Sequence, residues 1–412
     1  MKLSYFSPKI GGVRVCNGPL LEHIESCLEQ ERTLGYKPVS VAVHLRLISQ
    51  LNQWLVRTHR TLKGLNEAVI ERFLKQVRKG RRYTTGEPTT LGRLLDLLRD
   101  AGVIASAERP DRSPSQSMAD EYRSFLARER GLDSGTIYNY ARHIDRFLSE
   151  RFGADRVRLS QLTAREVIEF VKRDAHSLSR GHALQVVTAV RSFLRFARYR
   201  GYTKADLEVV VPRVANWKLA GLPKYLPRGA VRRVLDCCDR ATVTGRRDYA
   251  IFMLLARLGL RAGEIVALRL EDIDWENAEI TVRSKKGCGW ARLPLPADVG
   301  EAIACYLENG RPHCRCRNVF VRILAPHTPF ANSGVVSCIV MTALSEAGVE
   351  SARKGAHTFR HTLATDMLRN GASLDEIGQV LRHKDPDTTA IYAKVEIDAL
   401  RQLALPWTGG VR

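Results

Sequence analysis

His357-Thr358-Phe359-Arg360-His361 is a short stretch of the 412-residue chain in which basic side chains recur at helical spacing. We expect it to be helical, and residues three apart on a helix share a face, so His357 and Arg360 would approach the same ligand. The pair His357 and His361 could instead bind zinc. Arg360 would then set a cation against the metal, and the glutamate of a helical His-Glu-x-x-His site is absent. The stretch therefore favours an anionic ligand over zinc.

Arginine also stands in a second stretch, Gly259-Leu260-Arg261-Ala262-Gly263-Glu264-Ile265. A phosphodiester resists attack because the nucleophile and the phosphate are both electron-rich, so a site that cleaves it must neutralise charge on the phosphate oxygens. Arginine suits this role better than lysine, because its planar donors match two oxygens and it stays charged. Arg261 and Arg360 are our candidates. Glu264 would hold the Arg261 guanidinium or cap its helix, and we favour the first role.

Two further segments supply a histidine and a nucleophile. Leu381-Arg382-His383 contains the histidine, and Thr388-Thr389-Ala390-Ile391-Tyr392 ends in a tyrosine nine residues after it. Tyrosine has a reference pKa of about 10, so Tyr392 would be mostly protonated at neutral pH and would need electropositive surroundings. A covalent phosphotyrosine would store the broken bond, and a 5′-hydroxyl could then reseal the strand without ATP.

These four segments, taken in their order along the chain, resemble the active-site boxes of the tyrosine recombinases of the phage-integrase family. The resemblance spans roughly residues 225 to 400. It implies that Tyr392 forms a 3′-phosphotyrosyl intermediate on DNA, and that His357 acts as a general base or orients the phosphate. It also implies that His383 donates to a non-bridging phosphate oxygen beside the nucleophile.

In this family a lysine in a β-hairpin loop protonates the leaving 5′-oxygen. The corresponding loop reads Arg283-Ser284-Lys285-Lys286-Gly287. We prefer Lys286 to Lys285, because Lys286 precedes the glycine and stands at the family's usual distance from Pro294-Leu295. The glycine that usually precedes this lysine is replaced, and Arg382 stands where the family commonly has glycine. Both departures concern loop geometry rather than a reacting group.

Cysteine usage favours a reducing compartment. The nine cysteines include no Cys-x-x-Cys pair, so neither a disulfide framework nor a zinc ribbon is indicated. His313, Cys314 and Cys316 form one metal-like grouping, but with no second pair nearby we interpret them as a loop. No acidic cluster suggests a two-metal nuclease. We therefore expect neither a metal nor a cofactor.

The first half of the chain reads as a helical unit present twice, at residues 19–104 and 117–202. Matching positions keep an offset between 97 and 99, as in Leu65 with Leu162 and Gly102 with Gly201. The polar segment 108–117 between the copies, with two prolines and three serines, is typical of a linker.

The net charge of +21 indicates a polyanionic partner, because neutralising phosphates releases counterions and drives association. In the expected helix 182–200, an apolar face that includes Val186, Val190 and Phe193 should be buried. The opposite face carries a basic stripe that we expect either to contact double-stranded DNA or to remain solvated, formed by Arg191, Arg195 and Arg198.

We predict a mainly α fold with a small β-hairpin, at residues 278–283 and 291–295, in the catalytic domain. Tandem helical DNA-binding modules would precede that tyrosine-recombinase catalytic domain. Prolines at 212, 223 and 227 mark an extended connection. The expected parts are an N-terminal helical module, a core-binding SAM-like helical domain, a linker and the catalytic domain, at residues 1–108, 117–203, 204–225 and 226–412.

The resemblance implies a site-specific recombinase that integrates or excises a mobile element. It would act as a tetramer on two DNA sites, or in a hetero-assembly with related recombinases, and Val395–Leu403 would pack in cis or on a neighbouring subunit. The alternatives are a type IB topoisomerase and an accessory DNA-binding member of a recombinase set. The longest purely apolar stretch, Tyr249–Ala256, is too short to cross a membrane. We expect a cytoplasmic, nucleoid-associated protein without a membrane partner.

Overall fold

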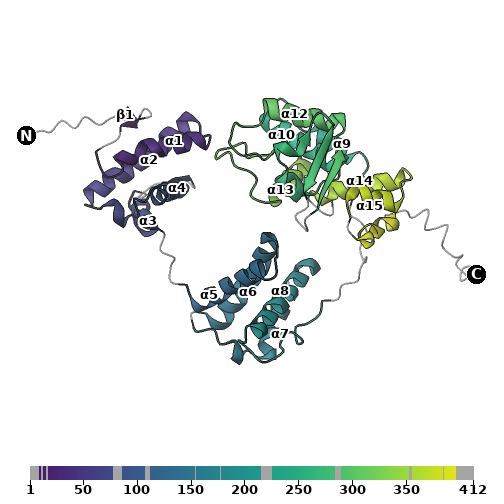
Figure 1. Ribbon diagram of the computed structural model, residues 1–412, viewed down its shortest axis with the longest axis horizontal. Coiled ribbons are helices and arrows are strands. Elements are labelled where there is room, and N and C mark those ends of the chain that lie inside the picture. The colour runs from purple at the N-terminus through teal and green to yellow at the C-terminus, as the bar shows by residue number, and fades with distance from the viewer. Residues whose placement is uncertain are drawn as a thin grey trace, which may run out of the picture. The chain divides into compact units, whose positions relative to one another are not determined.

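The computed structural model describes residues 9–10, 13–14, 17–77, 86–106, 112–153, 155–176, 178–214, 225–283, 289–351, 355–383 and 385–395. The chain divides into two compact units: residues 108–220, which include the helices labelled α5 to α8 in Figure 1, form one, and residues 1–107 together with 221–412 form the other. Most described residues are helical, and a small antiparallel sheet lies in the C-terminal part. The predicted fold class is confirmed.

The N-terminal part is a group of helices with its own core. Two short paired strands precede it, β1 (Lys9–Ile10) and β2 (Val13–Arg14). The helices are α1 (Ile24–Thr33), α2 (Pro38–Arg57), α3 (Glu67–Val77) and α4 (Gly86–Asp100). Apolar residues three and four apart along each helix are buried together, among them Leu51, Phe73 and Leu91.

The second unit repeats this order of helices: α5 (Pro114–Arg128), α6 (Ser134–Phe152), α7 (Ala164–His176) and α8 (Arg180–Tyr199). A short 3-10 turn precedes the third helix in each copy, at Leu62–Gly64 and at Leu159–Gln161. Leu65 and Leu162 directly follow these turns, and both are buried. The two copies thus share both the sequence offset and the order of elements.

The predicted apolar face of α8 is buried in the structure. Val186, Val190 and Phe193 are each fully covered. Phe193 and Phe196 pack against the ring of Tyr122 on α5, with centroids 5.3 Å apart in each pair. Aromatic contacts at this separation are favourable, and they hold α8 in the middle of the unit.

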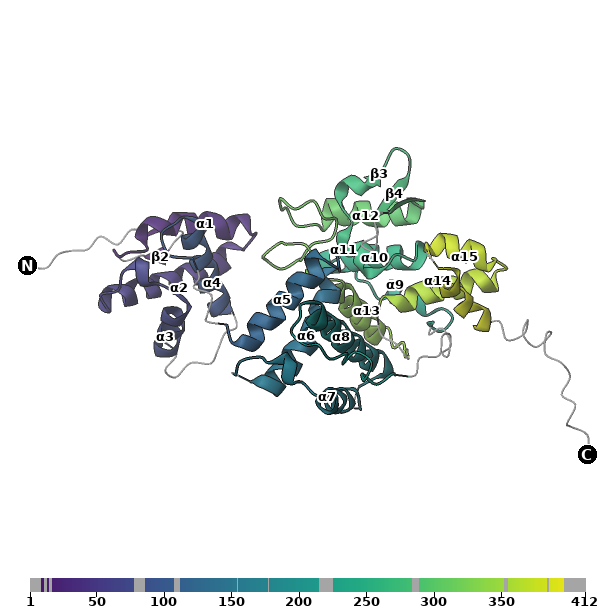
Figure 2. The same cartoon turned by 60° about the horizontal axis from the view of Figure 1, so that its bottom comes forward.

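The C-terminal lobe is built around α10 and a three-stranded sheet (Figure 2). The strands are ordered β3-β4-β5, and β4 pairs antiparallel with β5 from Glu279–Pro294 to Arg283–Trp290, close to the predicted hairpin. The elements are α9 (Ala230–Asp236), α10 (Val243–Arg257), α11 (Ala262–Ala267), β3 (Ile273–Asp274), β4 (Glu279–Arg283), β5 (Trp290–Pro294), α12 (Ala297–Asn309), α13 (Gly334–Glu346), α14 (His357–Arg369), α15 (Leu374–Leu381), η5 (Pro386–Thr388) and η6 (Ala390–Val395).

Helix α10 begins at Val243. Thr242 caps it, because its side chain accepts a hydrogen bond from the Gly245 N–H at 3.0 Å. The helix ends at Arg257, and Gly259 follows with φ +56°. Phe252 on α10 stacks on Phe359 of α14, with centroids 5.7 Å apart, so α10 supports the helix that carries Arg360.

Gly259 provides a test of how closely these elements approach. A Cβ at this position would stand 2.8 Å from Cδ2 of Leu381 and 3.0 Å from Cδ2 of Leu363. Gly371, at φ +88°, has the same left-handed backbone but nothing within 4 Å. We expect Gly371→Ala to cost roughly 1 kcal/mol from backbone strain and Gly259→Ala about 1–3 kcal/mol more from overpacking. Urea unfolding of both variants checks this, and equal losses would contradict it.

Candidate active site

Four elements of the C-terminal lobe carry the basic segments and the tyrosine. Arg261 is the residue that precedes α11, and α14 carries His357, Arg360 and His361. His383 follows α15, and Tyr392 lies on η6. Helix α14 packs against α15 and η6, and α15 and α14 lie side by side in both views (Figures 1 and 2).

Arg360 links the segment that begins at Gly259 to the segment that begins at Leu381. It is only 4% exposed, and its Nη1 and Nη2 donate to the backbone carbonyls of Gly259 and Leu381. Burial, together with the neighbouring Arg261 and Arg382, lowers the pKa of Arg360 to about 9. The guanidinium still carries its charge at neutral pH. It is therefore a buried cation held by two carbonyls that lie in different segments.

Glu264 connects Arg261 and Arg382. Its Oε2 accepts from the Arg261 N–H at 2.8 Å and from Arg382 Nη2 at 2.9 Å, and its Oε1 accepts from Arg261 Nη1 at 2.8 Å. Burial favours the neutral carboxyl, but these hydrogen bonds and the two guanidiniums outweigh it and hold the pKa of Glu264 below its ordinary value. Glu264 both caps α11 and orients Arg261.

Arg382 occupies the position at which the sequence departs from the family's glycine. Its backbone is left-handed, with φ 55° and ψ 48°, where the chain turns after α15. An arginine there bears strain that a glycine would avoid. Its side chain binds Glu264, and its carbonyl accepts from Arg261 Nη2 at 3.3 Å. The substitution thus adds a third guanidinium to the site while keeping the turn.

Tyr392 is almost completely buried, with 1% of its surface exposed. Its hydroxyl lies 2.8 Å from Nδ1 of His361, and its ring is parallel to that of His383, with centroids 6.4 Å apart. Burial raises the pKa of Tyr392 to about 12, although Arg360 opposes the rise. The phenol is therefore protonated at neutral pH, and deprotonation needs an acceptor close by.

His383 sits among the cations. Its Nδ1 lies 2.7 Å from the hydroxyl oxygen of Thr389. Burial lowers the pKa of His383 to about 4, with further contributions from Arg360, Arg261, His361 and Arg382. At neutral pH the ring is uncharged, so it can donate a hydrogen bond from one nitrogen without adding a further charge.

The lowered pKa of His383 can be measured directly. We expect its Cε1 proton resonance to titrate with a midpoint near pH 4, well below the reference value of about 6.5. The His383→Asn variant identifies the resonance by removing it. A midpoint at the reference value would show that burial and the cationic neighbours do not act on this ring as the geometry indicates.

The structure brings Arg261, Glu264, Arg360, His383 and Tyr392 together, through the contacts above. His357, the first residue of α14, has an exposed side chain. Lys286 and its rival Lys285 fall in residues 284–288, outside the described residues, as does most of 395–403.

His361 has a place that sequence reasoning did not assign to it, since it had been weighed only as a zinc ligand. Its ring contacts Tyr392, which lies 31 positions away in the chain. No periodicity links residues so far apart, so the sequence contained no signal for this contact. Among the residues that the structure describes, no three His, Cys, Asp or Glu side chains gather as a metal site would require.

The basic stripe of α8 has intramolecular partners in the second unit. Arg191 Nη2 donates to the carbonyl of Val211 at 2.8 Å. Arg195 pairs with Glu208, and Arg198 pairs with Asp206. These three arginines therefore hold the segment after α8 against the helix, and a DNA phosphate would have to compete with two carboxylates for them.

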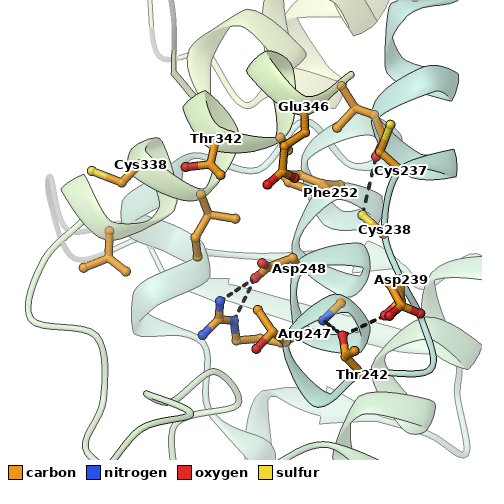
Figure 3. A pocket seen from close by; sticks show the side chains of 16 residues that line it. Cys237, Cys238, Asp239, Thr242, Arg247, Asp248, Phe252, Cys338, Thr342 and Glu346 are labelled. Carbon is orange, nitrogen blue, oxygen red and sulfur yellow. Dashed lines mark hydrogen bonds and ion pairs between the residues drawn. The ribbon is translucent and has the colours of Figure 1, made fainter. Parts of the chain in front are cut away.

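A separate pocket of about 460 Å³ lies between α9, α10 and α13 (Figure 3). Cys237, Cys238 and Glu346 line it, together with Asp248, which pairs with Arg247 at 2.7 Å. None of its lining residues belongs to the four segments above.

No described helix has the length and apolar character needed to span a membrane.

Comparison with known proteins identifies the family. The model of the phage integrase family matches residues 224–398, and that of the phage integrase N-terminal SAM-like domain matches residues 119–201. The chain is 43% identical over 394 residues to y4rA of Sinorhizobium fredii, a candidate integrase/recombinase, with 95% of each chain covered. The chain belongs to the phage integrase family. This integrase is also 32% identical to the tyrosine recombinase XerA of Thermococcus onnurineus, over 69% of its own length and 92% of XerA.

Solved structures share the fold of the integrase. The XerH recombinase in a post-cleavage complex with palindromic difH substrate has a TM-score of 0.52 at 17% identity, covering 81% of this chain and 93% of XerH. A lambda integrase tetramer bound to a Holliday junction has a TM-score of 0.52 at 18% identity, covering 76% of this chain and 88% of that one. Family membership makes the chain a tyrosine-type site-specific recombinase, an enzyme that cleaves and rejoins DNA strands.

Proposed function

We propose that this recombinase cuts DNA by attack of the Tyr392 hydroxyl on a backbone phosphate, which leaves a 3′-phosphotyrosyl intermediate. The observation that carries the proposal is the placement of Tyr392 beside His383 and Arg360. Its ring lies parallel to that of His383, and the positive charge of Arg360 favours the ionised form of its hydroxyl. A suicide DNA site, nicked near the cleavage point so that religation fails, tests it by trapping a covalent adduct that depends on Tyr392.

The catalytic roles follow from the charges around the phosphate. Arg261 and Arg360 would bind the non-bridging oxygens and stabilise the charge that develops there. His383, neutral at pH 7, would donate a hydrogen bond to one of the same oxygens, and His357 would orient the phosphate. Glu264 supports Arg261 through the contacts described above. Lys286, by its resemblance to the family's lysine, would protonate the leaving 5′-oxygen.

Buried Tyr392 also bears on when the site acts. Its hydroxyl is hydrogen-bonded within the lobe, at His361, and is nearly closed to solvent. Attack requires a phosphate to reach this oxygen while the oxygen keeps its contact with His361. We propose that the guanidiniums of Arg261, Arg360 and Arg382, which outnumber the one carboxylate of Glu264, draw the DNA phosphate to this place.

The domain assignment supports a grip on DNA from two parts of the chain. We assign residues 117–203 as the core-binding domain and 226–412 as the catalytic domain, joined by a linker at 204–225. The N-terminal module at 1–108 repeats the order of helices of the core-binding domain, which favours binding to flanking DNA or to another protomer. Arg191, Arg195 and Arg198 would reach DNA by exchanging carboxylates and carbonyls for phosphates.

We propose that the recombinase works as a tetramer on two double-stranded DNA sites, or together with related recombinases. The lambda integrase structure above is a tetramer on a Holliday junction, and XerH is bound to its difH substrate. Integration or excision of a mobile element, in the cytoplasm on the nucleoid, is the role that we assign. Type IB topoisomerase activity, the alternative with the same chemistry, predicts relaxation of a plasmid that carries no recombination site.

A further inference from the structure

We infer that His361 is the catalytic base that accepts the phenolic proton of Tyr392 as its oxygen attacks the phosphate. The inference rests on the proposed role of Tyr392 and assigns a residue to the proton transfer. His361 Nδ1 lies 2.8 Å from the Tyr392 hydroxyl oxygen, which is within direct proton-transfer reach. The contact joins α14, where Arg360 holds the phosphate site, to the segment that carries the nucleophile.

A base is needed because the phenol is held protonated. Burial places the pKa of Tyr392 at about 12, so only a very small fraction ionises at neutral pH without help. A positioned base contributes roughly 10² to 10⁴ in rate. The ionisable groups clustered around His361 and Tyr392 are Arg360 on α14, Arg261 directly before α11, Glu264 on α11, and Arg382 and His383 after α15. The hydroxyl of Thr389 is hydrogen-bonded to His383.

The hydrogen-bond contacts favour His361 over His383 as the acceptor. His383 is a weak base, since burial and the arginines lower its pKa to about 4, and its Nδ1 is engaged with Thr389. His361, in contrast, has Nδ1 directed at the hydroxyl that must lose its proton. His357 lies one turn earlier on the same helix with an exposed side chain, a position that suits orientation of the phosphate.

The step balances in protons and electron pairs. The proton of the Tyr392 hydroxyl moves to Nδ1 of His361, and the oxygen lone pair forms the bond to phosphorus. The bond from phosphorus to the 5′-oxygen breaks, and that oxygen takes a proton from the acid assigned above to Lys286. In the rejoining step the 5′-hydroxyl attacks, and the His361 imidazolium returns the proton to the departing tyrosine oxygen.

Single-turnover cleavage of a suicide site tests the base. We expect His361→Phe, which keeps a ring but no nitrogen, to form the covalent adduct about 10² to 10⁴ times more slowly than the unaltered protein. His361→Asn, which keeps a polar atom near Nδ1 but accepts no proton, should be slowed similarly and should be accelerated by added imidazole. His313→Phe, at an exposed histidine on the loop after α12, serves as the matched control and should cleave normally.

The leaving group separates a base from an acid. A substrate with sulfur in place of the 5′-bridging oxygen needs no protonation of its leaving group, so a base defect persists on it and an acid defect disappears. We expect the His361 variants to remain slow on this substrate.

Two results would overturn the inference: cleavage by both His361 variants within about threefold of normal, or recovery of their rates on the sulfur substrate. DNA affinity and the unfolding midpoint, measured alongside, show whether a variant is folded and bound. Because adduct formation by the unaltered protein and its loss in Tyr392→Phe report on the nucleophile alone, failure of the His361 prediction leaves the proposed function standing.

Discussion

The Tyr392→Phe variant should form no covalent adduct on a suicide DNA site, whereas the unaltered protein accumulates one. The change removes only the attacking oxygen. The ring still packs parallel to His383, and the lost contact is a single hydrogen bond to His361. Loss of one buried hydrogen bond costs about 1 kcal/mol, so the fold should persist while chemistry stops. Denaturing gel analysis of labelled DNA measures the adduct.

Tyr306→Phe is the matched control for this prediction. Tyr306 is another fully buried tyrosine of the same lobe, whose hydroxyl accepts from the Val321 N–H at 3.5 Å. We expect this variant to form the adduct at the normal rate. Adduct that persists in Tyr392→Phe would mean that another residue is the nucleophile. If the unaltered protein relaxed plasmids that lack a recombination site, type IB topoisomerase activity would be favoured instead.

The second large effect is expected from Arg360→Lys. Lysine keeps a positive charge, but it cannot donate along the two directions in which the guanidinium meets the carbonyls of Gly259 and Leu381 while also facing a phosphate. Loss of one such donor typically costs about 10² to 10³ in rate. We therefore expect cleavage to fall by about 10³ or more, with DNA affinity reduced far less, in single-turnover assays.

Stability should fall in the same variant, because buried backbone carbonyls lose their donors at about 1–3 kcal/mol each. Urea unfolding separates this effect from the loss of rate. Arg257→Lys is the control: Arg257 is exposed at the end of α10 and pairs with Asp298, and such surface pairs are worth little. A rate for Arg360→Lys within threefold of normal would remove Arg360 from the phosphate site.

Local features of the fold could be read from short stretches. The buried face of α8 and the β4–β5 hairpin both depend on the spacing of residue types along the chain. Such signals act over a few residues and need no knowledge of distant contacts.

The chemical groups of the site were likewise readable, since the segments around Arg261, Arg360, His383 and Tyr392 contain the residues that phosphate chemistry requires. The protonation states of these groups could not be read from the sequence. The pKa of His383 depends on burial and on arginines that three different segments contribute. Burial and long-range charge exist only once the chain is folded, so no pattern along the chain could have placed this histidine's pKa near 4.

The amino-acid sequence was sufficient to predict the helical modules, the hairpin and the family, and to name the candidate reacting groups, because these depend on residue type and short spacing. The tertiary structure alone decided which side chains contact one another. It brought His361 to Tyr392 across 31 residues, and gave Arg382 its left-handed turn and its bond to Glu264. It also paired the α8 arginines with the chain's own carboxylates. These pairings depend on which distant surfaces are buried together, and that is a property of the whole chain's packing.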